Sequence, residues 1–220
     1  MPAARELRIA GERVWLFAER ALYWPARDRL LVADLHLGKG DILRAAGIAV
    51  PSGGTRHDLA RLDALLHASG ARELWVLGDF LHGPRQARAE AQWRALVAAH
   101  RGCAFGVVAG NHDRALVADA LGVVRLPDDV REGPFRFRHH PLDDPDPAAG
   151  HVLCGHVHPV VALPGLPGRH PALALGHGQT ILPAFSAFTG GRPLDPRGPW
   201  IACARGEFAA LGDGPWRPPP

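Results

Sequence analysis

Short apolar runs, each bounded by charged or turn residues, dominate the first part of the chain and predict β-strands. These strands are expected over residues 7–9, 14–17, 21–24, 30–33, 73–77 and 104–109. Over residues 55–69 the apolar positions recur at helical spacing, and Gly70 supplies a stop, so a helix is expected there. A second helix is expected over residues 87–100. Strands that alternate with helices indicate an α/β sheet.

The second half of the chain reads as short strands and turns with few helical stretches. Strands are expected over residues 135–138, 151–154, 160–163, 172–175, 180–182 and 200–204. Asp-Pro repeats predict a loop over residues 143–149, and two glycines with a proline predict another over residues 183–191, which Phe185 and Phe188 would hold to the core. We therefore expect this half to form a second sheet that packs on the first.

The composition bounds the size and location of the protein. With 220 residues, 47% of them hydrophobic, the chain can fill one core, so we expect a single domain over residues 1–211 and a Pro-rich flexible tail over residues 212–220. A charged N-terminus and the absence of a long apolar run exclude a signal peptide and a membrane span, which favours a cytoplasmic protein. The three cysteines, Cys103, Cys154 and Cys203, suit a reducing compartment and are expected to be buried free thiols.

The net charge is +3, and the positive charge comes almost wholly from arginine, because Lys39 is the only lysine. This balance permits a polyanionic partner such as nucleic acid. The same arginine bias, together with abundant Ala, Gly and Pro, would also follow from a GC-rich genome. Charge alone therefore does not identify the partner.

Histidines and carboxylates gather in short segments, most of which follow a predicted strand. The segments are Asp34-Leu35-His36, Gly78-Asp79-Phe80-Leu81-His82, Gly110-Asn111-His112-Asp113, Arg138-His139-His140-Pro141 and Gly155-His156-Val157-His158. Ligands of α/β sheets bind beyond the carboxyl ends of the strands, where these segments are expected. Imidazole and carboxylate ligands without thiolate favour manganese, iron or zinc. If the segments stay extended, alternate residues such as Asp34 and His36 reach one ion, and His156 and His158 line one pocket.

The order of these segments resembles that of the calcineurin-like metallophosphoesterases, whose pattern is D-x-H, G-D-x-x-D/N/H, G-N-H-D/E, a histidine that ends a strand, and G-H-x-H. The resemblance covers about residues 30–158. It implies an α/β fold of two packed mixed β-sheets flanked by helices, with a dimetal site at the C-terminal ends of strands.

The resemblance also implies a set of ligands for two divalent metal ions, with Asp79 bridging them. The ligands are Asp34, His36 and His158 for one ion, and Asn111, His139 and His156 for the other. His139 is favoured because it ends a predicted strand, whereas His140 precedes a proline and should begin the turn. His140 remains the alternative ligand.

Three further residues are candidates for catalysis. By resemblance, His112 contacts the phosphate and protonates the leaving oxygen, and Asp113 orients the His112 ring. His82 stands where phosphoprotein phosphatases typically have Asp and resembles the form found in nucleases of the superfamily, which implies a place near the scissile phosphate. The alternative for His82 is a surface histidine beside the site.

Additional segments resemble one family within the superfamily. They are residues 21–25, 35–39, 47–53 and 182–191. Together they are similar, over nearly the whole chain, to the ligase-associated DNA damage response endonucleases called PdeM. The resemblance implies a bacterial, manganese-dependent enzyme that cuts DNA in repair beside a DNA ligase, a helicase and an exonuclease.

Basic residues next to the motifs are candidates for binding substrate phosphates. Lys39 and Arg44 follow the first motif and Arg114 follows the third, although each could instead be a solvated surface charge. Two other functions stay open: a phosphomonoesterase or nucleotide pyrophosphatase for small molecules, which would share every metal ligand, and a non-catalytic scaffold of the same fold. A scaffold would not need His112 and Asp113, so their presence disfavours it.

Overall fold

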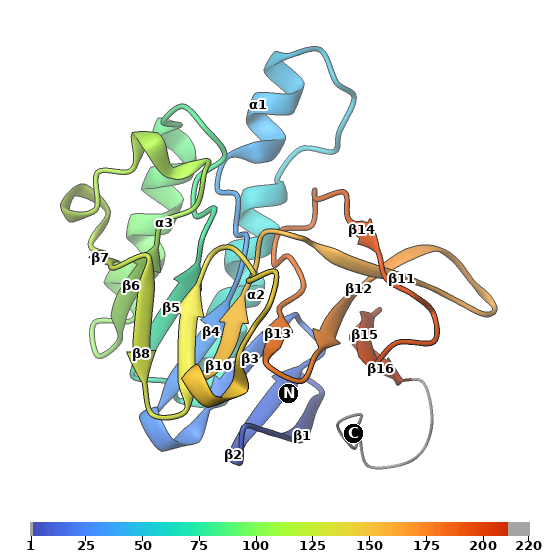
Figure 1. Ribbon diagram of the computed structural model, residues 1–220. Coiled ribbons are helices and arrows are strands. Elements are labelled where there is room, and N and C mark those ends of the chain that lie inside the picture. The colour runs from blue at the N-terminus through green and yellow to red at the C-terminus, as the bar shows by residue number, and fades with distance from the viewer. Residues whose placement is uncertain (1, 211–220) are drawn as a thin grey trace.

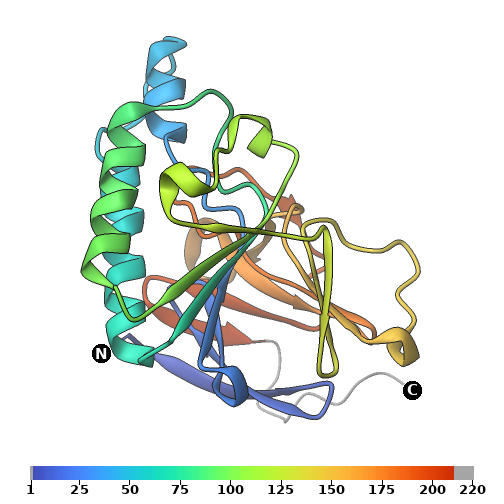
Figure 2. The ribbon, with the colours of Figure 1, turned by 90° about the vertical axis from the view of Figure 1, so that its left-hand side faces the viewer.

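The computed structural model describes residues 2–210, so the tail expected over residues 212–220 lies outside the described residues. Two mixed β-sheets pack face to face, and helices cover the outer face of the first sheet (Figures 1 and 2). This arrangement confirms the α/β fold expected from the sequence, including the second sheet built by the second half of the chain. None of the helices in residues 2–210 combines the length and apolar character needed to cross a membrane.

In the first sheet, strands that are consecutive along the chain are also neighbours in space. Its strands, in spatial order, are β1 (Ala4–Ile9), β2 (Glu12–Phe17), β3 (Ala21–Trp24), β4 (Arg29–Val32), β5 (Glu73–Leu77), β6 (Ala104–Val108) and β7 (Val124–Leu126). Neighbours from β1 to β4 are antiparallel, and neighbours from β4 to β7 are parallel. The strands β4, β5 and β6 therefore end at the same edge of the sheet.

Residues 2–210 contain three α-helices and four short 3-10 helices, all of them in connections of the first sheet except η4, which lies in the second half of the chain. They are α1 (Lys39–Ala45), α2 (Gly54–Ser69) and α3 (Ala87–Ala99), with η1 (Pro25–Arg27), η2 (Asp113–Ala115), η3 (Asp119–Leu121) and η4 (Pro147–Ala149). The helix α2 buries the leucines whose spacing predicted it, and it ends at Gly70, whose φ of 63° is left-handed. The helix α1 was not predicted, because its short sequence has no apolar period.

The second sheet is built from β8 (Asp129–Glu132), β9 (Phe135–Arg138), β10 (His151–Cys154), β11 (Pro159–Leu163), β12 (Leu166–Leu175), β13 (Gln179–Ile181), β14 (Arg192–Pro193), β15 (Trp200–Ala204) and β16 (Glu207–Ala210). Its order is β14-β11-β12-β13-β10-β9-β8, and β15 pairs with β12 and β16. Because β9 and β10 are parallel, the segments that follow them leave the sheet at the same edge.

The space between the sheets is filled by large apolar side chains. Trp24 and Phe135 meet edge to face with ring centroids 5.0 Å apart, and Leu31, Leu77 and Leu153 are fully buried beside them. A second apolar cluster lies between the first sheet and the helices α2 and α3. The cysteines are free thiols as expected; two are buried, and Cys103 is half-buried.

Candidate metal centre

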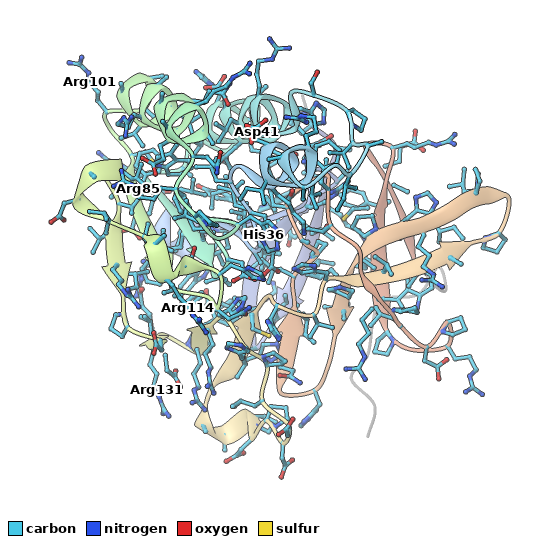
Figure 3. All side chains as sticks on the ribbon, turned by 90° about the horizontal axis from the view of Figure 1, so that it is seen from above. His36, Asp41, Arg85, Arg101, Arg114 and Arg131 are labelled. Atoms are coloured by element: carbon cyan, nitrogen blue, oxygen red, sulfur yellow. The ribbon has the colours of Figure 1, made fainter. Side chains whose placement is uncertain are left out.

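Strands of both sheets deliver the motif residues to one region. Asp34 and His36 follow β4, Asp79 and His82 follow β5, Asn111 and His112 follow β6, His139 follows β9, and His156 and His158 follow β10. Seen from above, His36 lies near the middle of the molecule, between the helices and the strands of the second sheet (Figure 3). The structure thus brings together the five segments that the sequence singled out.

A first cluster of metal-ligand atoms is formed by Asp34, His36, Asp79 and His158, all within 4.8 Å of one another. The Nε2 atoms of His36 and His158 are 3.3 Å apart, and His158 Nε2 is 3.5 Å from Asp34 Oδ1. His36 Nε2 is 3.9 Å from Asp79 Oδ2. Two imidazoles and two carboxylates at these separations could hold one cation.

A second cluster lies around His139, His140 and His156. His139 Nε2 is 3.0 Å from Asn111 Oδ1, 3.1 Å from His156 Nδ1 and 3.5 Å from Asp79 Oδ1. The exposed His140 ring packs against His156 with centroids 4.3 Å apart. His139 thus faces the other candidate ligands, whereas His140 approaches the cluster from the solvent side.

Asp79 stands between the two clusters. Its Oδ2 atom faces His36 in the first cluster, and its Oδ1 atom faces His139 in the second. The Oδ1 atom also accepts a hydrogen bond from the backbone N–H of His112 at 3.0 Å. One carboxylate therefore presents a separate oxygen to each cluster, which is the geometry of a bridging ligand.

The backbone at the site is strained. Of nine non-glycine residues with positive φ in residues 2–210, five are candidate metal ligands: Asp34, His36, Asp79, His156 and His158. Such conformations cost on the order of 1 kcal/mol or more each and persist where the surrounding structure enforces them. Asp34 and His36 share one cluster, as expected, but they reach it through left-handed backbone and not as alternate residues of an extended segment. His156 and His158, expected to line one pocket, belong to different clusters.

Glycines of the motifs allow the ligands to approach the backbone. A Cβ atom at Gly78 would lie 1.9 Å from His139 Nδ1, and one at Gly110 would lie 2.3 Å from Asp79 Oδ1. A Cβ atom at Gly155 would lie 2.6 Å from Asp34 Oδ2. Any side chain at these positions would displace a candidate ligand, so the glycines shape the cradle that a metal pair requires.

Burial keeps the inner imidazoles neutral, as metal binding demands. Desolvation, with nearby Lys39 acting in the same direction, lowers the pKa of His36 to about 2. Desolvation likewise lowers the pKa of His139 to about 4. The Nδ1 atom of His139 is 3.3 Å from the carbonyl oxygen of Leu77, so the ring donates there and its Nε2 lone pair faces Asn111. The donor set fits divalent cations that accept nitrogen and oxygen ligands.

His112 and His82 lie next to the first cluster. Their rings stack with centroids 4.9 Å apart, and the centroid of His36 is 5.4 Å from that of His112. His82 Nδ1 is 3.2 Å from His36 Nδ1, and burial lowers the pKa of His82 to about 4. The structure thus puts His82 at the site, in contact with a candidate ligand.

Asp113 does not orient the His112 ring, which corrects the expectation from the sequence. Its buried carboxylate accepts hydrogen bonds from the backbone N–H groups of Phe80, Leu81 and Gly110 at 3.1, 2.7 and 2.8 Å. No hydrogen bond within residues 2–210 joins it to the His112 side chain. Because its lone pairs face these amides, Asp113 holds two motif loops together.

The three basic candidates occupy different surroundings. Lys39 is half-buried near Asp79 and Asp34, and desolvation lowers its pKa while the two carboxylates oppose that shift. Arg44 binds Asp41 and donates to the carbonyl oxygen of Pro51 at 2.8 Å, so its guanidinium is already paired. Arg114 is exposed.

The loop over residues 183–191 lies against the site, a placement that the sequence did not reveal. The backbone N–H of Ser186 donates to the carbonyl oxygen of Asp34 at 3.2 Å, and that of Phe185 donates to Ala33 at 2.8 Å. Buried Asp58 accepts from the backbone N–H of Ala187 at 3.2 Å. The loop therefore supports the strained turn that carries Asp34.

Two other features of residues 2–210 lie apart from this site. Asp63, His67 and His100 form a separate cluster on the outer helices. A cavity of about 730 Å³ is lined by Arg8, His151 and residues at the amino-terminal ends of β9 and β10. None of the candidate metal ligands lines it.

Two packed mixed sheets, helices on the outer face and paired His/Asp clusters at strand ends define a metallophosphoesterase of the calcineurin type. Among solved structures, the crystal structure of Pseudomonas putida nuclease MPE is 34% identical, with a TM-score of 0.82 over 95% of this chain and 100% of that one. The chain belongs to this PdeM-like family of metallophosphoesterases, as the sequence resemblance implied.

Other comparisons add little. A protein of unknown function from Aquifex aeolicus is 19% identical, with a TM-score of 0.43 over 59% of this chain and 78% of its own. No protein-family model matches the chain, and no curated protein matches it either.

Proposed function

We propose that this protein is a manganese-dependent phosphodiesterase that hydrolyses DNA phosphodiester bonds by a two-metal mechanism. The observation that carries the proposal is Asp79, which turns one carboxylate oxygen toward each of two ligand clusters. The similarity to a nuclease of the same family supports nucleic acid as the substrate. The resemblance to PdeM extends the proposal to bacterial DNA repair, with a ligase, a helicase and an exonuclease as partners.

We assign the ligands according to the two clusters. One ion would be held by Asp34, His36 and His158, the other by Asn111, His139 and His156, with Asp79 shared between them. The contacts of His139 with Asn111, Asp79 and His156 support it over His140. Manganese is the proposed metal, because a mixed carboxylate, amide and imidazole set suits it; iron and zinc bind similar sets.

The side chains next to the clusters suggest which group has which role in catalysis. Two bound cations would supply a nucleophile at neutral pH and offset the charge of the phosphate. His112, stacked on His82 beside the first cluster, is placed to donate a proton to the leaving oxygen. His82, the other ring of this stacked pair, would contact the same phosphate. Asp113 maintains the loop geometry, as its bonds to three backbone amides require.

The exposure of the site favours a polymer over a small phosphomonoester. Asn111, His140 and His156 are exposed, so one side of the second cluster is open to solvent. The cavity among His36, Lys39, Ser186 and Phe188 is too small to hold a substrate, so a phosphate would reach the metals from the open side. An open metal centre can accept a phosphate that lies within a long strand.

Metal-stripped protein should be refilled with manganese and tested on closed circular plasmid, bis-p-nitrophenyl phosphate and p-nitrophenyl phosphate. We expect nicking and diester hydrolysis only with metal, and a loss of about 10²- to 10⁴-fold for His112→Ala with bound manganese retained. His57→Ala, which removes an exposed histidine of α2, should behave like the wild type. Hydrolysis of the monoester with plasmid untouched would contradict the proposal.

A further inference from the structure

A basic cavity adjoins the metal clusters at His158. Its volume is about 240 Å³, and it is lined in part by Arg20, Arg169, His170 and Arg205, with His158 at the metal side. We call this group of residues the basic cavity. These side chains come from the turn after β2, from β12 and from the turn between β15 and β16, so the chain fold gathers them from distant positions. The lining contains no carboxylate.

The guanidinium groups of the basic cavity lack acidic partners. Elsewhere Arg29, Arg61 and Arg85 each bind a carboxylate. Among residues 2–210 Arg20, Arg169 and Arg205 form no ion pair; the carboxylates nearest to Arg20, those of Asp58 and Glu19, are bound by Arg61. A cavity that gathers guanidinium groups without ion pairs attracts a polyanion.

Arg20 is held in place by hydrogen bonds to the backbone and forms no ion pair. Its Nη1 atom donates to the carbonyl oxygens of Phe185 and Ser186 at 3.4 and 3.2 Å, which anchors it to the loop behind Asp34. Burial lowers the pKa of Arg20 to about 10, with neighbouring Arg61 acting in the same direction, so the group stays charged at neutral pH. A rigid cation of this kind can bind an anion with little loss of side-chain entropy.

His170 provides an independent indication that a ligand belongs here. Its ring Nε2 atom is buried and has no hydrogen-bond partner among residues 2–210. A buried polar atom without a partner is energetically unfavourable, so native structures usually satisfy such atoms. A small rotation of the ring toward an oxygen in the cavity would satisfy it.

We infer that the basic cavity binds the phosphodiester backbone of the nucleic-acid strand next to the bond that is cut. This inference rests on the proposed function and names a substrate-binding surface for it. His158 is both a candidate metal ligand and part of the cavity wall, so an anion in the cavity is a neighbour of the scissile phosphate. Each nucleic-acid strand carries one phosphate per 3.4 Å of helix rise. A strand whose scissile phosphate lies at the metals therefore has further phosphates close to the metal centre.

The test compares two double variants with the same change in charge. Arg169→Gln with Arg205→Gln removes the exposed cations of the cavity, and Arg101→Gln with Arg125→Gln removes two exposed cations elsewhere. All proteins are loaded with manganese and assayed on a single-stranded oligonucleotide and on bis-p-nitrophenyl phosphate, which has no neighbouring phosphate. We expect the ratio of the two kcat/KM values to fall at least tenfold only in the cavity variant.

Oligonucleotide binding measured against salt gives a second readout that does not need cleavage. The slope of log affinity against log salt should become shallower by about 0.7 for each phosphate contact that is lost. An unchanged ratio and slope, or an equal loss in both double variants, would overturn the inference. Absence of cleavage by the wild type would refute the proposed function, whereas the binding slopes would still decide the role of the cavity.

Discussion

The carboxylate of Asp113 accepts a hydrogen bond from the backbone N–H of Leu81 at 2.7 Å and so ties the loop after β6 to the loop after β5. Its other oxygen accepts from Phe80 and Gly110. The two loops carry Asp79 and Asn111, so one buried carboxylate fixes the spacing between ligands of both clusters. In this motif the residue after His112 therefore has a structural role in the site.

Replacing Asp113 by Asn should destabilise the protein, because the amide nitrogen would face backbone N–H donors. We expect the free energy of unfolding to fall by about 1–3 kcal/mol. Urea denaturation of metal-stripped protein measures this without a contribution from bound metal. Asp119→Asn makes the same change at an exposed residue of the 3-10 helix η3, and its free energy of unfolding should stay within about 0.5 kcal/mol of the wild-type value. Equal stability of the two variants would contradict the structural role.

Asp79→Asn should weaken both metal sites together, because its two oxygens face different clusters. The neutral amide offers one oxygen in place of two and removes a negative charge. We expect both manganese dissociation constants to rise about tenfold or more. Titration followed by calorimetry and metal analysis resolves the two equivalents, and loss of one equivalent with the other intact would exclude a bridging role.

The adjacent histidines should differ in metal binding. His139 is buried with Nε2 toward Asn111 and His156, whereas His140 is exposed. We expect His139→Gln to lose one of two manganese equivalents and His140→Gln to retain both, as measured by metal analysis after desalting. The reverse pattern would assign the ligand to His140. Circular dichroism of each variant distinguishes loss of a ligand from loss of the fold.

Much of the fold follows from local sequence patterns, and the site follows from them only in part. The buried strands β4 to β6 were predicted from continuous apolar runs, and the helix α2 was predicted from apolar residues at helical spacing. The left-handed backbone at Asp34 and Asp79 was not, because Asp adopts positive φ more often than most residues but still rarely, so its presence is a weak signal. Only the folded loops reveal these turns.

Contacts between segments that lie far apart in the chain could not be predicted from the sequence either. The bond from Ser186 to Asp34 and the grouping of Arg20, Arg169 and Arg205 depend on how the two sheets pack. Motif spacing identified Lys39 and Arg44 as phosphate-binding candidates, yet Arg44 is paired with Asp41. A basic residue that follows a motif in the sequence is therefore not always an unpaired charge near the metal centre.

His151 should make stability depend on pH independently of the metal centre. It is buried at the start of β10, where its Nε2 atom is 2.9 Å from Thr180 Oγ1. Desolvation lowers its pKa from 6.5 to about 4, so between these values the unfolded chain binds a proton that the native protein does not. Stability is therefore fully present above pH 6.5 and falls as the pH drops toward 4, by up to about 1.4 kcal/mol per pH unit.

The contribution of His151 can be isolated with His151→Gln, which keeps a hydrogen-bonding side chain but does not titrate. Unfolding free energies of metal-stripped protein, measured by urea denaturation from pH 7.5 to 4.5, should fall less steeply for this variant than for the wild type. His57→Gln removes an exposed histidine instead and should retain the wild-type slope. Parallel curves for the wild type and His151→Gln would mean that His151 is protonated equally in the folded and unfolded states, because a difference in proton binding is what produces the slope.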